Sequence, residues 1–451
     1  MKIIIVGVGK LGEYLAKLLV KEQHEVTLID LKFNGKESLI NNEDVNYIQG
    51  NGLDSNILIE SGISNSDLLI SVMKEDSENV MCALIGKKLG AKSTIARIRS
   101  LEYSSSINLI KEELGLSMTI NPEYLAASQI AQTLSIPSAI DATSFFKGKI
   151  NVISLKVTEK TSLENKSIED ISKKLKNNVI ICAIEREDKI IIPDGNTKLK
   201  INDIVHITGT RKDINSFLKY AKQISEKTKN VIIGGGSNIA VYLSKMLLDM
   251  GMHVKIIEDD IKRCDDIATE LPDILVINGD LSDQNILFEE GIRTCDAFVP
   301  LTSIDEENIV YSMFASNLNV PKVITKINHI NLDNITDIAN IDSVVTPHKI
   351  AANHVIQYVR AKQNSNASSC EAIYNFGDNI FQISEFKIKE DFKLKDRKIS
   401  DLKFKENVLI TAIQRGRNII YPRGNDELKL NDNILVVTNN NDFKSLNDLV
   451  K

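Results

Sequence analysis

Short β-branched runs alternate with amphipathic helical patterns through the first part of the chain. After the first run, four leucines recur at the spacing of one helix face: Leu11, Leu15, Leu18 and Leu19. Strands that alternate with amphipathic helices are typical of βαβ units and a parallel sheet. We therefore expect residues 1–137 to form a doubly wound α/β domain. Its strand-like runs are Ile3–Val6, Glu25–Ile29, Asn46–Gln49, Leu68–Val72, Ser93–Ile98 and Ser117–Ile120.

The hydrophobic pattern changes in the next part of the chain. Longer extended runs occupy Ile150–Val157, Val179–Ile184 and Ile204–Thr208. A turn at Pro193-Asp194-Gly195 separates the last two of them. This pattern predicts a small α+β module over residues 138–225.

Both patterns then recur. NVIIGGGSNIAVYLSKMLLDMGMHVKIIE in the second half matches KIIIVGVGKLGEYLAKLLVKEQHEVTLID at the start, and INGDLSDQNILFEEGI matches IQGNGLDSNILIESGI. A repeat of about half the chain indicates a duplicated pair of domains, because solenoid repeats are far shorter. The prediction is a second doubly wound domain at residues 229–362 and a second small α+β module at residues 367–451.

Composition narrows the location and the partners. Hydrophobic residues make up 43% of the chain and charged residues 26%, as in an ordinary soluble globular protein. No apolar run reaches the roughly 18 residues that a membrane helix needs. The run Ile3–Val8 lacks the features of a signal peptide, so we expect a cytoplasmic protein. A net charge of −6 argues against nucleic acid as a partner.

Cysteine and histidine spacing gives no sign of a metal centre. The five cysteines form no CxxC pair, and the six histidines form no HxxxH group. We interpret the cysteines as small core residues of a protein in a reducing compartment. No structural or catalytic metal is expected.

The strongest chemical motif is a glycine-rich turn between the first predicted strand and helix. In GxGxxG turns the first glycine allows the tight turn, the second lets a phosphate approach the backbone, and the third lets helix and strand pack. The helix N-terminus then presents free N–H groups to the anion. This favours a Rossmann-like nucleotide domain. The motif consists of Gly7, Val8, Gly9, Lys10, Leu11 and Gly12.

An acidic residue follows at the distance that the motif requires. Asp30 ends the next predicted strand, where a carboxylate can accept hydrogen bonds from both ribose hydroxyls. A carboxylate there also repels a 2′-phosphate. The pattern therefore favours NAD over NADP.

The second copy of the turn departs from the motif. Gly235 aligns with Gly7, but Ser237 stands in place of Gly9, and Ala240 in place of Gly12. Ser237 adds a Cβ where a phosphate would approach, although the neighbouring Gly236 gives the loop room. Glu258 is the acidic residue at the position equivalent to Asp30. The sequence leaves open whether this half binds the same ligand, a smaller one or none.

At this point the residues resemble a known family. The chain is similar to the TrkA-type peripheral subunits of Trk potassium-uptake systems, which carry two RCK nucleotide-binding domains, each followed by a small RCK C-terminal domain. The similarity extends over essentially the whole chain. The matching stretches are GVGKLG with Asp30, GNGLD, SVMKEDSENV, IARIRS and NPE in the first half, and GDLSD, LTSIDEENI and PHKIAANHVIQYVR in the second.

The resemblance implies a regulatory protein rather than an enzyme. Such a subunit lies peripherally on the cytoplasmic face of the membrane, as a homo-oligomer in the form of a dimer or a tetramer ring. It binds NAD(H), with ATP or ADP as further ligands, and gates a separate membrane potassium-translocating subunit. Which nucleotide activates, the ring stoichiometry and the identity of the pore subunit stay open.

The resemblance also implies cofactor-binding residues beyond the glycine turn. In the first half, Asn51, Gly52 and Asp54 are expected beside the adenosine. Ser71, Val72, Asp76 and Asn79 are expected over the phosphates. Arg97 is expected to point into the pocket, the alternative for Arg97 and Arg99 being a surface salt bridge. In the second half the expected set is Gly235, Gly236, Ser237, Asn238, Ile239, Glu258, Asp280, Thr302 and Lys326.

Two other functions are compatible with parts of the pattern. An NAD-dependent oxidoreductase would need a proton-transfer group near the nicotinamide. The first small module offers only His206, in a predicted strand where a packed core residue is the more common role. The small modules could also bind a cyclic dinucleotide, although nothing between Ile150 and Thr208 identifies such a pocket.

Overall fold

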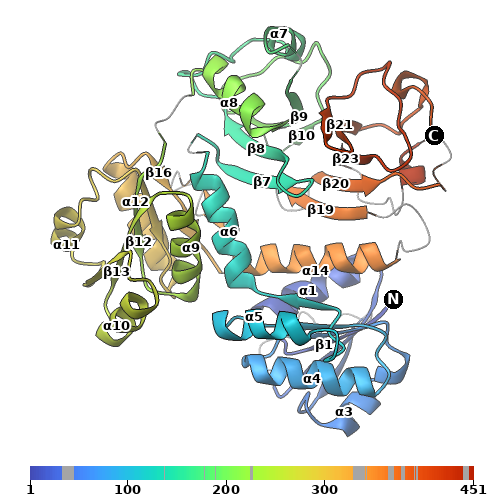
Figure 1. Cartoon of the computed structure of the whole chain (residues 1–451), viewed down its shortest axis with the longest axis vertical. Helices are drawn as coiled ribbons and strands as arrows, with labels where there is room; N and C mark the ends of the chain where they lie inside the picture. The colour runs from blue at the N-terminus through green and yellow to red at the C-terminus, as the bar shows by residue number, and fades with distance from the viewer. Residues whose placement is uncertain are drawn as a thin grey trace.

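A computed structural model of the chain has two parallel and two antiparallel sheets that alternate along the described residues (Figure 1). A short two-stranded pair lies within the second half. None of the helices in this part of the chain is long and apolar enough to span a bilayer. The described residues are 1–32, 45–136, 138–176, 178–187, 189–223, 227–328, 341, 343–363, 370–376, 381–390, 392, 395–439 and 446–450.

The first sheet is parallel, with strand order β3-β2-β1-β4-β5-β6. Its order reverses between β1 and β4, and open α/β sheets bind ligands at such a switch point. Leu11 and Leu15 of the first helix cover one face of the sheet, and Cys82 covers the other. The elements are β1 (Lys2–Val6), α1 (Lys10–Lys21), β2 (Glu25–Asp30), β3 (Val45–Gln49), α3 (Ser55–Glu60), η1 (Ile63–Asn65), β4 (Leu68–Ser71), α4 (Asp76–Lys88), β5 (Thr94–Arg97), α5 (Leu101–Ile110) and β6 (Met118–Ile120).

The next sheet is antiparallel, with strand order β10-β9-β11-β8-β7. The predicted extended runs form β8, β9 and β11, and a further strand, β7, lies at the sheet edge. Phe217 and Ile214 of the last helix are buried in its core. The elements are β7 (Asp141–Phe145), β8 (Ile150–Lys156), α7 (Ile168–Lys174), β9 (Ile180–Arg186), β10 (Lys189–Ile191), β11 (Ile204–Gly209) and α8 (Arg211–Tyr220).

The second half repeats this architecture. Its parallel sheet runs β14-β13-β12-β15-β16, and its antiparallel sheet runs β19-β20-β23-β21-β22, the same order as in the first half. This confirms the predicted fold class of tandem Rossmann-like sheets, each followed by a small α+β unit. The elements are β12 (Asn230–Gly234), α9 (Asn238–Asp249), β13 (His253–Glu258), α10 (Ile261–Glu270), β14 (Leu275–Asn278), α11 (Gln284–Glu289), β15 (Ala297–Pro300), α12 (Asp305–Asn317), β16 (Lys322–Val323), β17 (Thr325–Lys326), β18 (Val344–Val345), β19 (Cys370–Phe376), β20 (Phe381–Lys387), η4 (Ile399–Asp401), β21 (Val408–Arg415), β22 (Asn418–Ile420), β23 (Asn433–Thr438) and η5 (Leu446–Leu449).

Two further helices, α6 (Pro122–Leu134) and α14 (Pro347–Gln363), exchange partners between the halves (Figure 1). Helix α6 of the first half packs on α9 of the second, and α14 of the second half packs on α1 of the first. Alanines on both helices let the backbones approach closely: Ala126 and Ala127 on α6, and Ala351 and Ala352 on α14. Each half therefore completes the core of the other.

The two antiparallel sheets also share a core. Phe145 and Val152 of the first sheet pack with Phe381 and Val437 of the second. At the edge of this contact, the Tyr421 hydroxyl accepts a hydrogen bond from the Thr210 amide at 2.8 Å and donates one to Asp213. The halves are thus joined both at the parallel sheets and at the small units.

Candidate nucleotide-binding sites

The first glycine turn leads from β1 into α1 at the sheet's switch point. Gly7 has a φ of +93°, and a Cβ there would lie 2.8 Å from the Met73 amide nitrogen. A Cβ on Gly12 would lie 2.1 Å from the Gly7 carbonyl oxygen. Gly9, by contrast, has nothing within 4 Å of that position. Gly7 and Gly12 are therefore needed for packing within the protein. Gly9 leaves open space at the N-terminus of α1, where an anion is favoured.

Asp30 lies directly beside this turn. Its Oδ2 accepts a hydrogen bond from the Val8 amide at 2.6 Å, and its Oδ1 accepts one from the Lys32 amide at 3.1 Å. These bonds fix the carboxylate at the end of β2. A ribose next to the turn would meet it in the position expected from the spacing.

The loop after β3 is held against the sheet by its own side chains. Asn51 Oδ1 accepts a hydrogen bond from the Leu53 amide, and Asp54 caps α3 by accepting one from the Asn56 amide at 2.8 Å. A Cβ on Gly52 would lie 2.1 Å from Cγ1 of Val6. This glycine therefore lets the loop approach the end of β1, beside the turn.

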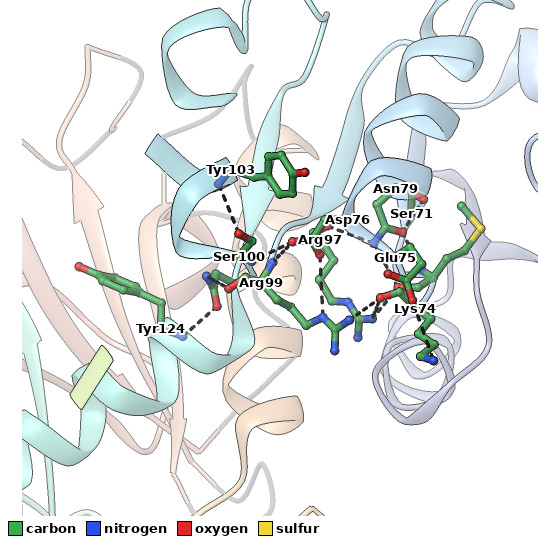
Figure 2. Close-up of polar contacts among 12 residues, drawn as sticks. Ser71, Lys74, Glu75, Asp76, Asn79, Arg97, Arg99, Ser100, Tyr103 and Tyr124 are labelled. Carbon is green, nitrogen blue, oxygen red and sulfur yellow. Dashed lines mark hydrogen bonds and ion pairs between the residues drawn. The ribbon is translucent and has the colours of Figure 1, made fainter. Parts of the chain in front are cut away.

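A buried amide joins the ends of β4 and β5 (Figure 2). Asn79 is 0% exposed, and its Oδ1 accepts hydrogen bonds from the Ser71 hydroxyl at 3.0 Å and from the Met73 amide at 2.7 Å. Its Nδ2 donates to the carbonyl oxygens of Met73 and Arg97, each at 3.1 Å. All the amide's hydrogen-bonding groups are used within the protein, so Asn79 positions the loop that contains Ser71 and Val72.

Two arginines lie together under that loop, as Figure 2 shows. The Arg97 guanidinium donates to the Met73 carbonyl, and the Arg99 guanidinium donates to the Lys74 carbonyl. Asp76 Oδ2 accepts hydrogen bonds from the amides of Arg99 and Ser100, at 2.9 and 2.8 Å. Within the described residues Arg97 has no ion pair, whereas Arg99 Nε lies 3.9 Å from Asp76 Oδ1, so the alternative of a salt bridge is seen for Arg99 and not for Arg97.

The environment of these arginines favours an anion. Burial lowers the pKa of Arg97, and the neighbouring charge of Arg99 lowers it further. Nε of each arginine is buried without a hydrogen-bond partner in the structure. Burial raises the pKa of the nearby Glu123 carboxyl, although both arginines act to lower it. A bound phosphate would relieve the repulsion between two adjacent cations.

The second glycine turn has a similar backbone and one additional side chain. Gly235 also has a φ of +93°, and Glu258 accepts a hydrogen bond from the Gly236 amide, as Asp30 does from Val8. Arg263 of α10, which the sequence analysis did not single out, donates to the Gly236 carbonyl at 2.6 Å and to Asn238 Oδ1 at 3.3 Å. Its position five residues after the ribose acid is the signal that would have identified it.

Ser237 occupies the position of the second glycine in this turn. Ser237 is the N-cap residue of α9, and its hydroxyl is buried without a hydrogen-bond partner. Ile239 is buried on the core face of the same helix. The equivalent Gly9 of the first turn has open space around it, whereas the Ser237 hydroxyl is enclosed by the protein.

The rest of the second site mirrors the first. Asn308 is 0% exposed, accepts hydrogen bonds from the amide and hydroxyl of Thr302, and donates to the carbonyls of Thr302 and Lys326. The Lys326 ammonium donates to the Thr302 carbonyl, as Arg97 donates to Met73, and burial lowers the pKa of Lys326. Asp280 accepts a hydrogen bond from the Ser282 amide. The second site thus repeats the buried amide of the first and has a lysine where the first has Arg97.

Comparison with known proteins agrees with this duplication. A family model described as the TrkA-N domain matches residues 3–122 and 231–347, and one described as the TrkA-C domain matches residues 152–222 and 383–451. The chain is 30% identical over 447 residues to a Trk system potassium uptake protein TrkA homolog 1 of Methanosarcina mazei, with 97% of each chain covered. It is 28% identical to the TrkA protein of Haemophilus influenzae, with 97% of this chain and 95% of that one covered.

Solved structures show the same fold at lower identity. The RCK domain structure of GsuK superposes with a TM-score of 0.64 at 15% identity, covering 97% of this chain and 92% of that one. A GsuK channel bound to NAD superposes with the same TM-score, and 76% of that chain is covered. Two matched domain pairs and full-length relatives place the chain in the TrkA family of Trk system potassium uptake proteins.

Proposed function

We propose that this chain is the nucleotide-sensing regulatory subunit of a Trk-type potassium uptake system. The observation that carries the proposal is the first turn: open space at Gly9, the fixed Asp30 carboxylate and the two adjacent arginines. Together they offer a phosphate site and a ribose acceptor at one switch point. Solved GsuK channels bound to NAD and to ADP support NAD(H) as the ligand, with ATP or ADP as the alternatives.

The second half would bind a nucleotide with more positive charge and less space at the turn. Arg263 and Lys326 add positive charge, while Ser237 narrows the approach to the turn. In this proposal Gly235, Gly236 and Asn238 face the phosphates, and Glu258 faces the ribose. A ligand with a terminal phosphate gains more from the two cations than a dinucleotide does.

Regulation requires that occupancy change the arrangement of the domains. A ligand shifts an equilibrium only through different affinities for two states. The crossed helices α6 and α14 connect each Rossmann-like sheet to the core of the other half, and they also contact β7 and β19 of the small units, so a rotation of one sheet would be transmitted to both small units. We propose that this rotation, within a homodimer or tetramer ring on the cytoplasmic face of the membrane, acts on the potassium-translocating subunit.

An oxidoreductase receives no support from the small domain. His206 is 2% exposed, and its ring contacts Ser154 at 2.9 Å, Glu185 at 2.9 Å and the Phe381 ring. Both ring nitrogens are therefore engaged in the core between the small units. This histidine has the packed role expected of it.

Calorimetric titration with NADH, NAD, ATP and ADP tests the proposal. We expect saturable NADH binding to be lost in Asp30→Ala and kept in Glu60→Ala, an exposed carboxylate at the end of α3. NADPH should bind poorly, because Asp30 repels its 2′-phosphate. Loss of a separate binding phase in Glu258→Ala would identify a second working site. If none of the four nucleotides binds, the sensing function is wrong.

A further inference from the structure

The crossed helices create two equivalent junctions, and one of them is closed by an ion pair. In this closed junction, Arg360 near the end of α14 donates to Glu22, the C-cap residue of α1, and to Gln382 of the second small unit at 2.7 Å. The two charged side chains are only 18% and 21% exposed. The contact fastens the first Rossmann-like sheet to the second small unit.

The other junction lacks these charges. Met250, the C-cap residue of α9, is equivalent to Glu22, the C-cap residue of α1. Ser135, the C-cap residue of α6, is equivalent to Arg360, because each follows the first proline of its helix by the same number of residues. No ion pair can form between a methionine and a serine. A cavity of about 550 Å³ lies here instead, between the end of α6, helix α8 and the start of the second Rossmann-like sheet. Ligand pockets for small molecules have this size.

The cavity wall combines an apolar floor with positive charge. Leu218 and Met252, 7% and 8% exposed, contribute to the floor. Three cationic residues, Arg211, Lys219 and Lys227, line the cavity, and its described lining contains no aspartate or glutamate. All three residues are exposed, and no side-chain ion pair or hydrogen bond of theirs is found among the described residues. Such uncompensated charge beside an apolar floor suits an anion carried on an apolar body.

A buried threonine also lines the cavity. Thr228 is 5% exposed, and its Oγ1 is enclosed by the protein without a hydrogen-bond partner. The site is therefore defined by the apolar floor and the three cations.

We propose that this junction binds a small amphipathic phosphate monoester, which fastens the first small unit to the second Rossmann-like sheet. The Arg360–Glu22 pair fastens the first Rossmann-like sheet to the second small unit in the same way. The phosphate lies among Arg211, Lys219 and Lys227, and the apolar body lies on Leu218 and Met252. Occupancy of this site would restrain the relative movement of the halves from a position outside both glycine turns.

Titration of the full-length protein with octyl phosphate tests the site. We expect one saturable phase that is absent with inorganic phosphate and with octanol, because each lacks one of the two required parts. Lys219→Gln should weaken binding about tenfold, since it removes one charge-assisted contact. Lys212→Gln, on the exposed face of the same helix, should leave it unchanged. Octanoate in place of octyl phosphate separates a carboxylate ligand from a phosphate one, and equally tight octanoate binding would overturn the phosphate assignment.

A second variant tests the comparison between the junctions. Ser135→Arg combined with Met250→Glu places the charges of the closed junction in the open one, and we expect it to abolish octyl phosphate binding and to raise the melting temperature. The nucleotide titrations should stay as in the unaltered protein, which keeps this result separate from the proposed sensing function. Octyl phosphate binding that is unaffected by this variant, or equal in the two lysine variants, would overturn the proposal.

Discussion

Single buried amides hold the two candidate sites together. Asn79 and Asn308 each join a strand end to the next loop through hydrogen bonds to the same kinds of atoms. Because both are fully buried and fully paired, their contribution is to fix the backbone that faces a ligand. Asn79 and Asn308 are therefore positioning residues rather than groups that contact a ligand.

Replacement of Asn79 should reveal this positioning role as a loss of stability. Asn79→Ala leaves the Ser71 hydroxyl, the Met73 amide and the Arg97 carbonyl without their partner. Unpaired buried polar groups cost about 1–3 kcal/mol each, and relaxation reduces the sum, so we expect a loss of about 3 kcal/mol. Urea unfolding measures it. Ser77→Ala, an exposed change in the same helix turn, is the control, and an equal effect of the two would contradict the role.

The Arg360–Glu22 pair should make stability depend on pH in acid. Burial acts to raise the pKa of Glu22, but hydrogen bonds from His24 and Arg360, together with their charge, lower it below its ordinary value of 4.5. A carboxyl whose pKa is lower in the folded state stabilises the fold above pH 4.5 and loses this contribution as the pH falls through its folded value. Arg360→Met should cost about 2 kcal/mol at neutral pH.

The same variant separates charge from packing. The difference in unfolding free energy between Arg360→Met and the unaltered chain should shrink as the pH falls below 4.5, because the protonated Glu22 no longer needs its cation. In a double-mutant cycle, Arg360→Met should cost less in the Glu22→Gln chain than in the unaltered one, and the remaining cost reports the bond from Arg360 to Gln382. A difference that is the same in acid and at neutral pH would mean that Arg360 acts through this bond and its alkyl chain, and not through the charge of Glu22.

At the scale of elements, helix α9 is connected directly to the first candidate site. Asn121 Nδ2, at the start of α6, donates to the Tyr242 hydroxyl at 2.8 Å, and that hydroxyl donates to the Arg99 carbonyl at 3.1 Å. The Arg99 amide, on the other side of the same residue, donates to Asp76. Two hydrogen bonds through Arg99 therefore link Asp76, at the start of α4, to helix α9, which follows the second glycine turn.

Removal of the Tyr242 hydroxyl should weaken this connection. We expect Tyr242→Phe to cost about 1 kcal/mol of stability and to reduce the hydrogen-exchange protection that nucleotide binding at the first site confers on α9. Tyr124→Phe is the matched control, because the two rings stack edge to face at 5.5 Å and no hydrogen bond of the Tyr124 hydroxyl is found among the described residues. Equal protection of α9 in both variants would show that the sites are coupled by another route.

Some of this organisation could be predicted from the sequence, and some could not. The doubly wound α/β class and the turn around Gly7 follow from local periodicity and from the glycines, which act within a few residues. The exchange of α6 and α14 does not, since an alanine-rich helix face is equally suited to either half. Arg360 and Glu22 lie 338 residues apart, a contact that no local pattern specifies. Arg263 lies in α10, outside both the glycine turn and the strand that ends in Glu258, so neither motif identifies it.

At the scale of the whole molecule, the duplication yields one folding unit rather than two linked ones. The α6 face that carries Ala127, Ile130 and Leu134 belongs to the core of the second Rossmann-like sheet, and the second small unit shares a core with the first. Buried apolar surface supplies most of the stabilisation of a fold. Each half alone would therefore expose faces that the intact chain covers.

Expression of the halves separately tests this unity. We expect residues 1–225 alone, and residues 229–451 alone, to self-associate or to melt well below the full chain, because the α6 and α14 faces lose their partners. Co-expression should give a stable one-to-one complex with the melting behaviour of the full chain, measured by size-exclusion chromatography with light scattering and by calorimetry. Introducing Ile130→Glu into the first half should prevent that complex, since it places a charge in the shared core. A monomeric, cooperatively folded first half would show that the two copies kept separate cores, and domain rotation would then have to act through the small units alone.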